Sequence, residues 1–127
     1  VQRGIATFTQ QEIRGYNIFN SNCASCHAEP LFSNYGFANN GLTIDSTLKD
    51  IGRQKITSNS SDSLLFKIPS LRNLAYTFPY MHDGRFKTLR EVLKHYTGEI
   101  QKSPSLHIAL KNGITLTKNE QTDLISF

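Results

Sequence analysis

The sequence predicts an all-α domain in which a few short helices are joined by long loops. Three Thr-x-x-Glu patterns, at Thr9, Thr88 and Thr117, place a threonine that caps a helix and a glutamate that caps in return. Between the first two patterns, residues 28–87 are rich in Asn, Ser, Gly and Pro and lack the sustained alternation of strands. The length of 127 residues fits one compact domain spanning residues 1–127.

Each capping pattern is followed by apolar residues at helical spacing. The first helix is expected over about residues 10–21, where bulky side chains recur on one side: Ile13, Tyr16 and Phe19. The second begins after Thr88, stops near Gly98, and shows the i, i+3, i+4, i+7 spacing of a core-facing helix: Leu89, Val92, Leu93 and Tyr96. The third carries Leu124, Ile125 and Phe127. Short helical turns are expected in the long loop, around residues 46–50 and 61–66.

Composition and charge argue against two classes of protein. No apolar run is long enough to cross a bilayer, so no transmembrane segment is expected. The 14 Lys and Arg against 10 Asp and Glu give a net charge of +4, but the basic residues are scattered and form no run. Nucleic-acid binding is therefore not expected. The composition instead predicts a soluble globular domain.

Residues 23–27 read Cys-Ala-Ser-Cys-His and contain the only two cysteines of the chain. This pattern is typical of c-type haem attachment. Two cysteines three positions apart reach the two vinyl groups on one edge of a haem, and the adjacent histidine turns its imidazole beneath the iron. We therefore predict that Cys23 and Cys26 bind one haem c covalently and that His27 is the proximal iron ligand.

Other roles for the cysteine pair are a redox dithiol, half of a zinc site or a simple disulfide. Thioredoxin-like pairs lie between a strand and a helix, whereas this pair follows a predicted helix. A zinc site would need two more ligands, which only His82, His95 and His107 could supply. A haem would also organise the long loop, which side-chain packing alone does not explain. The favoured fold is a c-type cytochrome, with helices and long loops wrapped around one covalent haem.

Met81 is the only methionine and is one candidate for the second, distal iron ligand. Thioether ligation is common in electron-transfer haems, because it favours ferrous iron and raises the reduction potential. The alternative is that Met81 fills a gap in the core.

Four segments resemble the C-terminal haem domain of the bacterial di-haem cytochrome c peroxidase and MauG family. They are residues 15–19 before the haem motif, Phe-Lys-Ile-Pro-Ser-Leu-Arg-Asn at 66–73, Pro-Tyr-Met-His-Asp-Gly at 79–84, and the tail at 116–120. The resemblance spans essentially the whole chain. It implies a parent protein with two haem domains, of which this chain is a C-terminal fragment.

The resemblance supplies a second candidate for the distal ligand. The position that provides methionine in the peroxidases corresponds to Tyr96, and MauG-type proteins are similar in carrying tyrosine there. A phenolate would stabilise ferric or higher-valent iron and lower the potential relative to methionine. We prefer Tyr96 to Met81 as the distal ligand. The alternative for Tyr96 is a core aromatic residue with a satisfied hydroxyl group.

The remaining site predictions concern histidines and cationic residues. His82 resembles a family position beside the haem, where it would order the pocket by hydrogen bonding. Arg72 is a candidate for the haem propionates because its forked guanidinium suits a carboxylate; Arg53 and Gln54 are weaker candidates, and a surface role is favoured for Arg53.

Two further histidines are expected at the surface. His95 neighbours Tyr96 but should point about 100° away around the helix. His107 follows Pro104 in a polar loop. Neither is assigned a role in the site.

The family resemblance also implies a second metal. In the peroxidases a calcium ion lies between the two domains, so the backbone carbonyls of Thr77 and Pro79 are candidate ligands. Without the other domain, that site would be incomplete.

The function implied by the resemblance is electron transfer. The domain would relay electrons to a peroxide-reducing haem in the N-terminal domain, from a small cytochrome or cupredoxin, in the periplasm. No catalytic residue is expected here, and the isolated domain is not expected to be active alone. The alternatives are the haem domain of a MauG-type oxidase acting on a protein or other substrate, and a stand-alone electron-carrier cytochrome.

Overall fold

The computed structural model describes residues 7–127. The α-helices of this part are α1 (Gln10–Asn22), α2 (Gln54–Thr57), α3 (Leu89–Lys94) and α4 (Lys118–Ser126). Strands β1 (Phe37–Ala38) and β2 (Phe66–Lys67) form one antiparallel pair. Short 3-10 turns lie at Ser60–Asp62, Leu74–Tyr76 and Ile108–Leu110, and a π-turn, His95–Glu99, directly follows α3. Within residues 7–127, no helix has the length and apolar character needed to cross a bilayer.

The three predicted capping boxes are confirmed. In α1, the Thr9 hydroxyl accepts from the Glu12 backbone N–H at 3.2 Å, and the Glu12 carboxylate accepts from the Thr9 N–H at 2.6 Å. Helices α3 and α4 begin in the same way at Thr88 and Thr117. The all-α expectation holds for the main elements, while the two short strands depart from it. In the long loop, residues 46–48 form only a turn.

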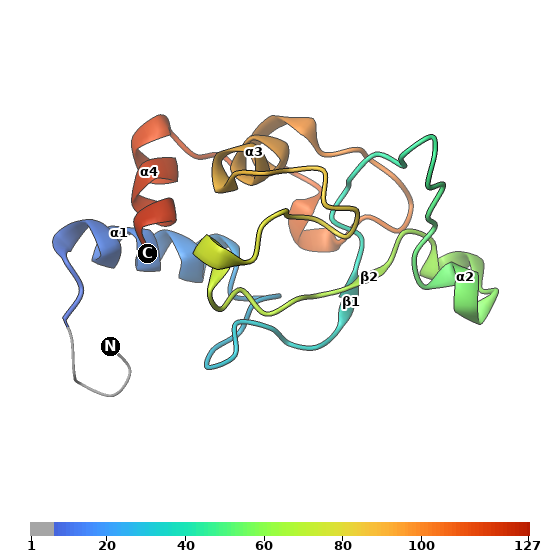
Figure 1. The fold of residues 1–127 in the computed structure, drawn as a ribbon, viewed down its shortest axis with the longest axis horizontal. Helices are drawn as coiled ribbons and strands as arrows, with labels where there is room; N and C mark the ends of the chain where they lie inside the picture. Colours follow the sequence, from blue (N-terminus) through green and yellow to red (C-terminus); the bar gives the residue numbers. More distant parts are fainter. Residues whose placement is uncertain (1–6) are drawn as a thin grey trace.

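Helices α1 and α4 lie side by side at one end of the molecule (Figure 1). Gly15 is buried at this contact, where a Cβ atom would come within 2.1 Å of the Asp123 carbonyl oxygen. Arg14 reinforces the contact by donating from Nε to the Asp123 carboxylate at 2.7 Å. Four rings lie with centroids 5.2–6.2 Å from that of Phe127: Phe8, Tyr16, Phe19 and Phe32. This aromatic cluster fixes α1, and with it the start of the Cys-x-x-Cys-His turn.

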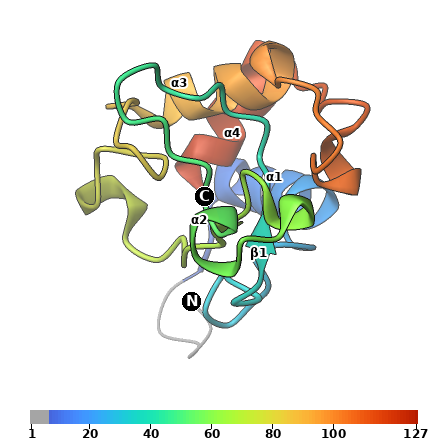
Figure 2. The same ribbon diagram turned by 90° about the vertical axis from the view of Figure 1, so that its right-hand side faces the viewer.

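The segment between α1 and α3 is mostly irregular and extends to the opposite end, where α2 lies (Figures 1 and 2). Isolated backbone bridges join it to distant chain, such as Asn39 to Leu106. The Asn39 side chain is 1% exposed and donates to the hydroxyl groups of Ser103 and Ser105. Among residues 7–127, the buried large apolar side chains are Phe19, Leu42, Ile68 and Leu106, each still 4–8% exposed. Polar contacts therefore organise a segment that has little apolar core of its own.

Candidate cofactor site

The Cys-x-x-Cys-His motif forms a tight turn at the end of α1. The backbone N–H of Cys23 still donates to the Phe19 carbonyl at 2.8 Å, and the His27 N–H donates to the Cys23 carbonyl at 2.9 Å. Both thiols are half-buried and neither forms a disulfide. The end of α1 thus leads directly into a turn that carries two free thiols and one imidazole.

The His27 imidazole is oriented by two backbone carbonyl groups. Its Nδ1 atom lies 3.1 Å from the carbonyl oxygens of both Phe32 and Pro69. Because carbonyl oxygens only accept hydrogen bonds, Nδ1 carries the proton and Nε2 keeps its lone pair. Burial lowers the pKa of His27, and the two hydrogen bonds only partly offset this effect. The ring is therefore held as a neutral imidazole with Nε2 available to a metal.

The environment of Cys23 does not suit a reactive redox dithiol. Burial, with a smaller contribution from the charge of Cys26, raises the pKa of Cys23 to about 11. Nucleophilic cysteines in redox motifs have lowered pKa values and an electropositive environment. The structure thus argues against a thioredoxin-like role.

Tyr96 lies in the π-turn that extends α3. The Thr97 hydroxyl donates to the Leu93 carbonyl at 2.9 Å, and the Tyr96 carbonyl accepts from the Ile114 N–H at 3.2 Å. Burial raises the pKa of Tyr96, a hydrogen bond from the Asn40 side chain lowers it, and the charges of Cys23 and Cys26 raise it. Burial is the largest of these influences, so the pKa of the Tyr96 phenol lies above its ordinary value.

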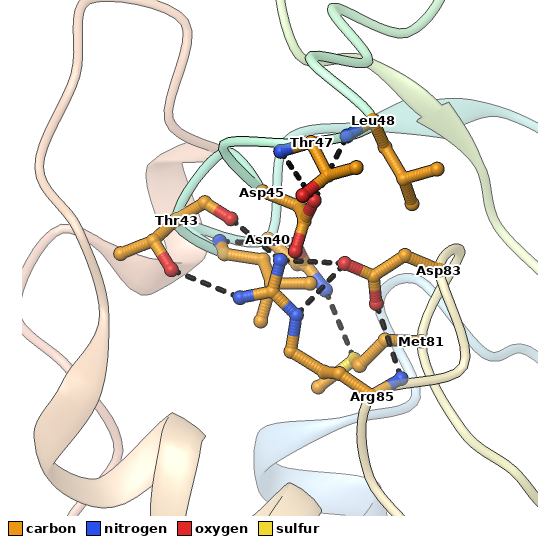
Figure 3. Close-up of polar contacts among 9 residues, drawn as sticks. Asn40, Thr43, Asp45, Thr47, Leu48, Met81, Asp83 and Arg85 are labelled. Carbon is orange, nitrogen blue, oxygen red and sulfur yellow. Dashed lines mark hydrogen bonds and ion pairs between the residues drawn. The ribbon is translucent and has the colours of Figure 1, made fainter.

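Met81 lies in a closed loop, residues 80–86, with its backbone in the left-handed region (φ 72°). The Tyr80 N–H donates to the Phe86 carbonyl at 2.7 Å and closes the loop. The thioether sulfur accepts a hydrogen bond from Asn40 Nδ2 at 3.4 Å (Figure 3). Met81 is therefore held towards Asn40.

An ion pair anchors the 80–86 loop to the neighbouring segment. Arg85 Nε donates to the Asp83 carboxylate at 2.8 Å, while its Nη1 and Nη2 atoms donate to the hydroxyl and carbonyl oxygens of Thr43 at 2.9 and 2.8 Å (Figure 3). The Asp83 side chain is only 3% exposed. Burial alone would raise the pKa of Asp83, but the hydrogen bonds and charge of Arg85 outweigh it and hold the pKa below its ordinary value.

The surface prediction for His95 is wrong. His95 is 2% exposed, and its Nε2 atom lies 2.9 Å from the Asn40 carbonyl oxygen, to which it must donate. The irregular chain at residues 39–42 covers this side of the π-turn. Helical geometry alone predicts that this side faces solvent. His107 is half-buried, and its Nδ1 atom accepts from the Ala109 N–H at 3.3 Å, so it caps a 3-10 turn. Asn40 was not predicted as a site residue, because no local pattern distinguishes it from the other loop asparagines.

The residues brought together here fit a covalently attached haem. Cys23 and Cys26 are free thiols, and His27 has the tautomer that a metal requires. A haem is large and apolar, and the described chain buries few apolar side chains of its own. Residues 7–127 hold no group of three or more His, Cys, Asp or Glu side chains arranged for a metal ion.

Comparison with known proteins identifies the family. Methylamine utilization protein MauG of Methylorubrum extorquens is 36% identical over 118 residues, which cover 90% of this chain and 32% of that protein. Cytochrome c peroxidase Ccp of Escherichia coli is 33% identical over 125 residues, covering 94% of this chain and 24% of that protein. The chain belongs to the MauG and cytochrome c peroxidase family. It spans a third or less of the length of these relatives. No protein-family model matches the chain.

Solved structures agree with the MauG and cytochrome c peroxidase assignment. A MauG-like protein associated with microbial copper homeostasis superposes with a TM-score of 0.83 at 29% identity, covering 98% of this chain and 47% of that one. The diheme peroxidase BthA of Burkholderia thailandensis superposes with a TM-score of 0.76 over the whole chain and 43% of its own length. At 20% identity, the second match supports the fold alone.

The structure also places the other predicted site residues of this family member. The His82 ring stacks on Phe66 with centroids 3.6 Å apart, and burial lowers the pKa of His82 against the opposing charges of Asp83 and Asp50. Arg53 is engaged by Asp62 at 3.2 Å and by the Phe37 ring, in keeping with its expected surface role. Gln54 begins α2 and Arg72 is exposed. Thr77 and Pro79 lie on an exposed segment.

Proposed function

We propose that this chain is a haem c domain that transfers electrons within a larger di-haem protein. The observation that carries the proposal is the tautomer of His27: two carbonyl groups hold Nδ1–H and leave Nε2 free, directly beside two unpaired thiols. Cys23 and Cys26 would attach the haem through thioether bonds, and His27 would bind its iron. The bound haem would supply a one-electron iron couple.

The chain's own residues would set the properties of that couple. His27 donates through Nδ1 to backbone carbonyls, which fixes the ring plane and strengthens Nε2 as a ligand. Tyr96 is our choice for the distal ligand, because it matches the ligand position of the family and because Asn40 holds the Met81 thioether. A filled distal position leaves no site for peroxide, so the domain would relay electrons and not reduce peroxide itself.

Haem attachment is tested by producing the chain with haem-attachment machinery and extracting it with acid-acetone. We expect the haem to stay with the protein and the intact mass to include it. The matched control replaces both Cys23 and Cys26 by Ala, which should make the haem extractable. Complete extraction from the unaltered chain would overturn the assignment.

The distal ligand is tested by ferric spectra of two variants. We expect a phenolate charge-transfer band that is lost in Tyr96→Phe and retained in Met81→Leu. A methionine charge-transfer band that survives Tyr96→Phe and disappears in Met81→Leu would reject Tyr96.

The larger protein would contribute a second haem in an N-terminal domain, which receives the electrons. A small cytochrome or cupredoxin in the periplasm would donate them, and the carbonyls of Thr77 and Pro79 would help hold calcium between the domains. In the two-domain protein, replacing Cys23 and Cys26 by Ala should abolish peroxide reduction while the other haem remains. Full activity of that variant would contradict the electron relay.

A second candidate is the haem domain of a MauG-type oxidase, which acts on a protein or other substrate. The observation that favours it is Tyr96, since an anionic phenolate stabilises higher-valent iron that methionine would not. The two functions can be distinguished in the intact protein. Stoichiometric peroxide consumption driven by a reduced donor supports the peroxidase. Accumulation of a high-valent state without a donor supports the oxidase. A stand-alone carrier is disfavoured by the family match across the chain.

A further inference from the structure

Asn40 links the segments that carry both candidate distal ligands. Its backbone carbonyl accepts from His95 Nε2 at 2.9 Å, beside Tyr96 in the π-turn. Its side-chain Nδ2 donates to the Met81 sulfur at 3.4 Å, and Figure 3 shows the amide directed towards that loop. These contacts join positions 41 and 55 residues apart in the sequence.

The orientation of the Asn40 amide is determined by its neighbours. Its Oδ1 atom accepts from the Leu42 backbone N–H at 3.3 Å, so the two Nδ2 hydrogens are left for other acceptors. One is directed to Met81 Sδ. The amide of Asn40 therefore holds Met81, while the backbone carbonyl of the same residue holds His95 next to Tyr96.

The backbone around Asn40 has little freedom to adjust. The Gly41 N–H donates to the Asn39 side chain at 2.8 Å, and the Gly41 carbonyl accepts from the Gln101 N–H at 2.7 Å. Two residues later, Thr43 accepts both hydrogen bonds from Arg85, which fixes the Met81 loop to the same segment. A change at the Asn40 side chain should thus alter ligand contacts without moving the scaffold.

We propose that Asn40 is a positioning residue that selects the distal ligand, with its amide retaining the Met81 thioether and its backbone carbonyl holding the π-turn that carries Tyr96. The inference rests on the haem attachment proposed above. Met81 can bind iron only after its sulfur has left the amide, so the hydrogen bond withholds Met81 and leaves the distal position to Tyr96.

The test compares haem-loaded variants by ligand spectra in both oxidation states and by reduction potential. Asn40→Leu removes the bond to the Met81 sulfur at similar volume. Asn40→Asp also cannot donate, but keeps an acceptor for the Leu42 N–H if the leucine variant folds poorly. Thr43→Ser is the matched control, because it alters the same segment but keeps the Asn40 amide and the hydroxyl group that accepts from Arg85. Asn40→Leu combined with Met81→Leu reports whether any new ligand is the methionine.

We expect the ratio of methionine to tyrosine ligation to rise about fivefold when the hydrogen bond to the Met81 sulfur is lost. The reduction potential of Asn40→Leu should lie above that of the double variant by about 40 mV or more, which is a fivefold change converted at 59 mV per decade for one electron. Thr43→Ser should keep the wild-type spectrum. An unchanged ratio in both Asn40 variants, an equal change in Thr43→Ser, or methionine ligation already in the wild type would overturn the selection role. A wild-type chain without covalent haem would instead overturn the proposed function.

Discussion

The two ends of the domain are stabilised in different ways. Around α1 and α4, helix packing is so close that Gly15 touches the opposing backbone, and aromatic rings surround Phe127. In the segment between α1 and α3, the chain is irregular and is held by buried polar groups such as Asn39 and the Asp83–Arg85 pair. The first end is held by helix packing and aromatic contacts, whereas the second relies on polar anchors and buries few apolar side chains.

The largest effect is expected from Gly15→Ala at the helix contact. The new Cβ atom would meet the Asp123 carbonyl oxygen at 2.1 Å, and backbone on both sides cannot yield as a side chain would. We expect the free energy of unfolding to fall by at least about 3 kcal/mol, measured by urea denaturation. Gly98→Ala is the control, because nothing lies within 4 Å of its added Cβ and its φ is not in the left-handed region. Similar losses in both variants would mean that the helix contact is not the cause.

The polar end is tested by Arg85→Met, which leaves the Asp83 carboxylate buried without its partner. Removing one member of a buried ion pair costs about 3 kcal/mol, and the anchors to Thr43 are lost as well. Unfolding should become less cooperative, with the signal from the 80–86 loop lost first in hydrogen exchange. Lys94→Met breaks the exposed pair with Glu99 and should have no measurable effect. Equal stability of the two variants would contradict the anchoring role.

Cys23 caps the end of α1, where the irregular segment begins. The reactivity of its thiol reports whether the site is already ordered before haem is attached. Because burial raises the pKa of Cys23 from 9.0 to about 11, the thiolate at pH 8 should be roughly a hundredfold scarcer than in the unfolded chain. We expect iodoacetamide to modify haem-free Cys26→Ser protein correspondingly slowly, with normal rates restored in urea. Fast modification without urea would show that the thiol becomes buried only with the cofactor.

The smallest expected effect is the loss, at acid pH, of the stabilisation that the Asp83–Arg85 pair contributes. Since the pKa of folded Asp83 is held below its ordinary value of 3.8, the pair stabilises the fold above that pH, and the contribution is lost as pH falls through the lower folded value. The stability difference between wild type and Arg85→Met should therefore be constant at neutral pH and shrink below about pH 4. Denaturant titrations from pH 7 to pH 3 measure it. A difference that grows on acidification would have the wrong sign for this mechanism.

Local sequence patterns predicted the scaffold well. Each of the three capping boxes spans only four residues of the chain, so each helix start depends on its own local hydrogen bonds. The Cys-x-x-Cys-His turn also follows directly from the end of α1. The end of α3 was less predictable: the expected helix up to Gly98 ends at Lys94 and continues as a π-turn, which changes how His95 and Tyr96 are directed.

The sequence alone determined the helix starts and the attachment motif, because capping and thiol spacing are short-range properties of the chain. Only the tertiary structure decided what surrounds the motif: the carbonyls of Phe32 and Pro69 that set the His27 tautomer, the burial of His95, and the contacts of Asn40 with Met81 and His95. Most of these contacts join residues more than 40 positions apart through irregular chain, where no periodic pattern records which groups will meet. Their geometry exists only once the loops have packed against the scaffold.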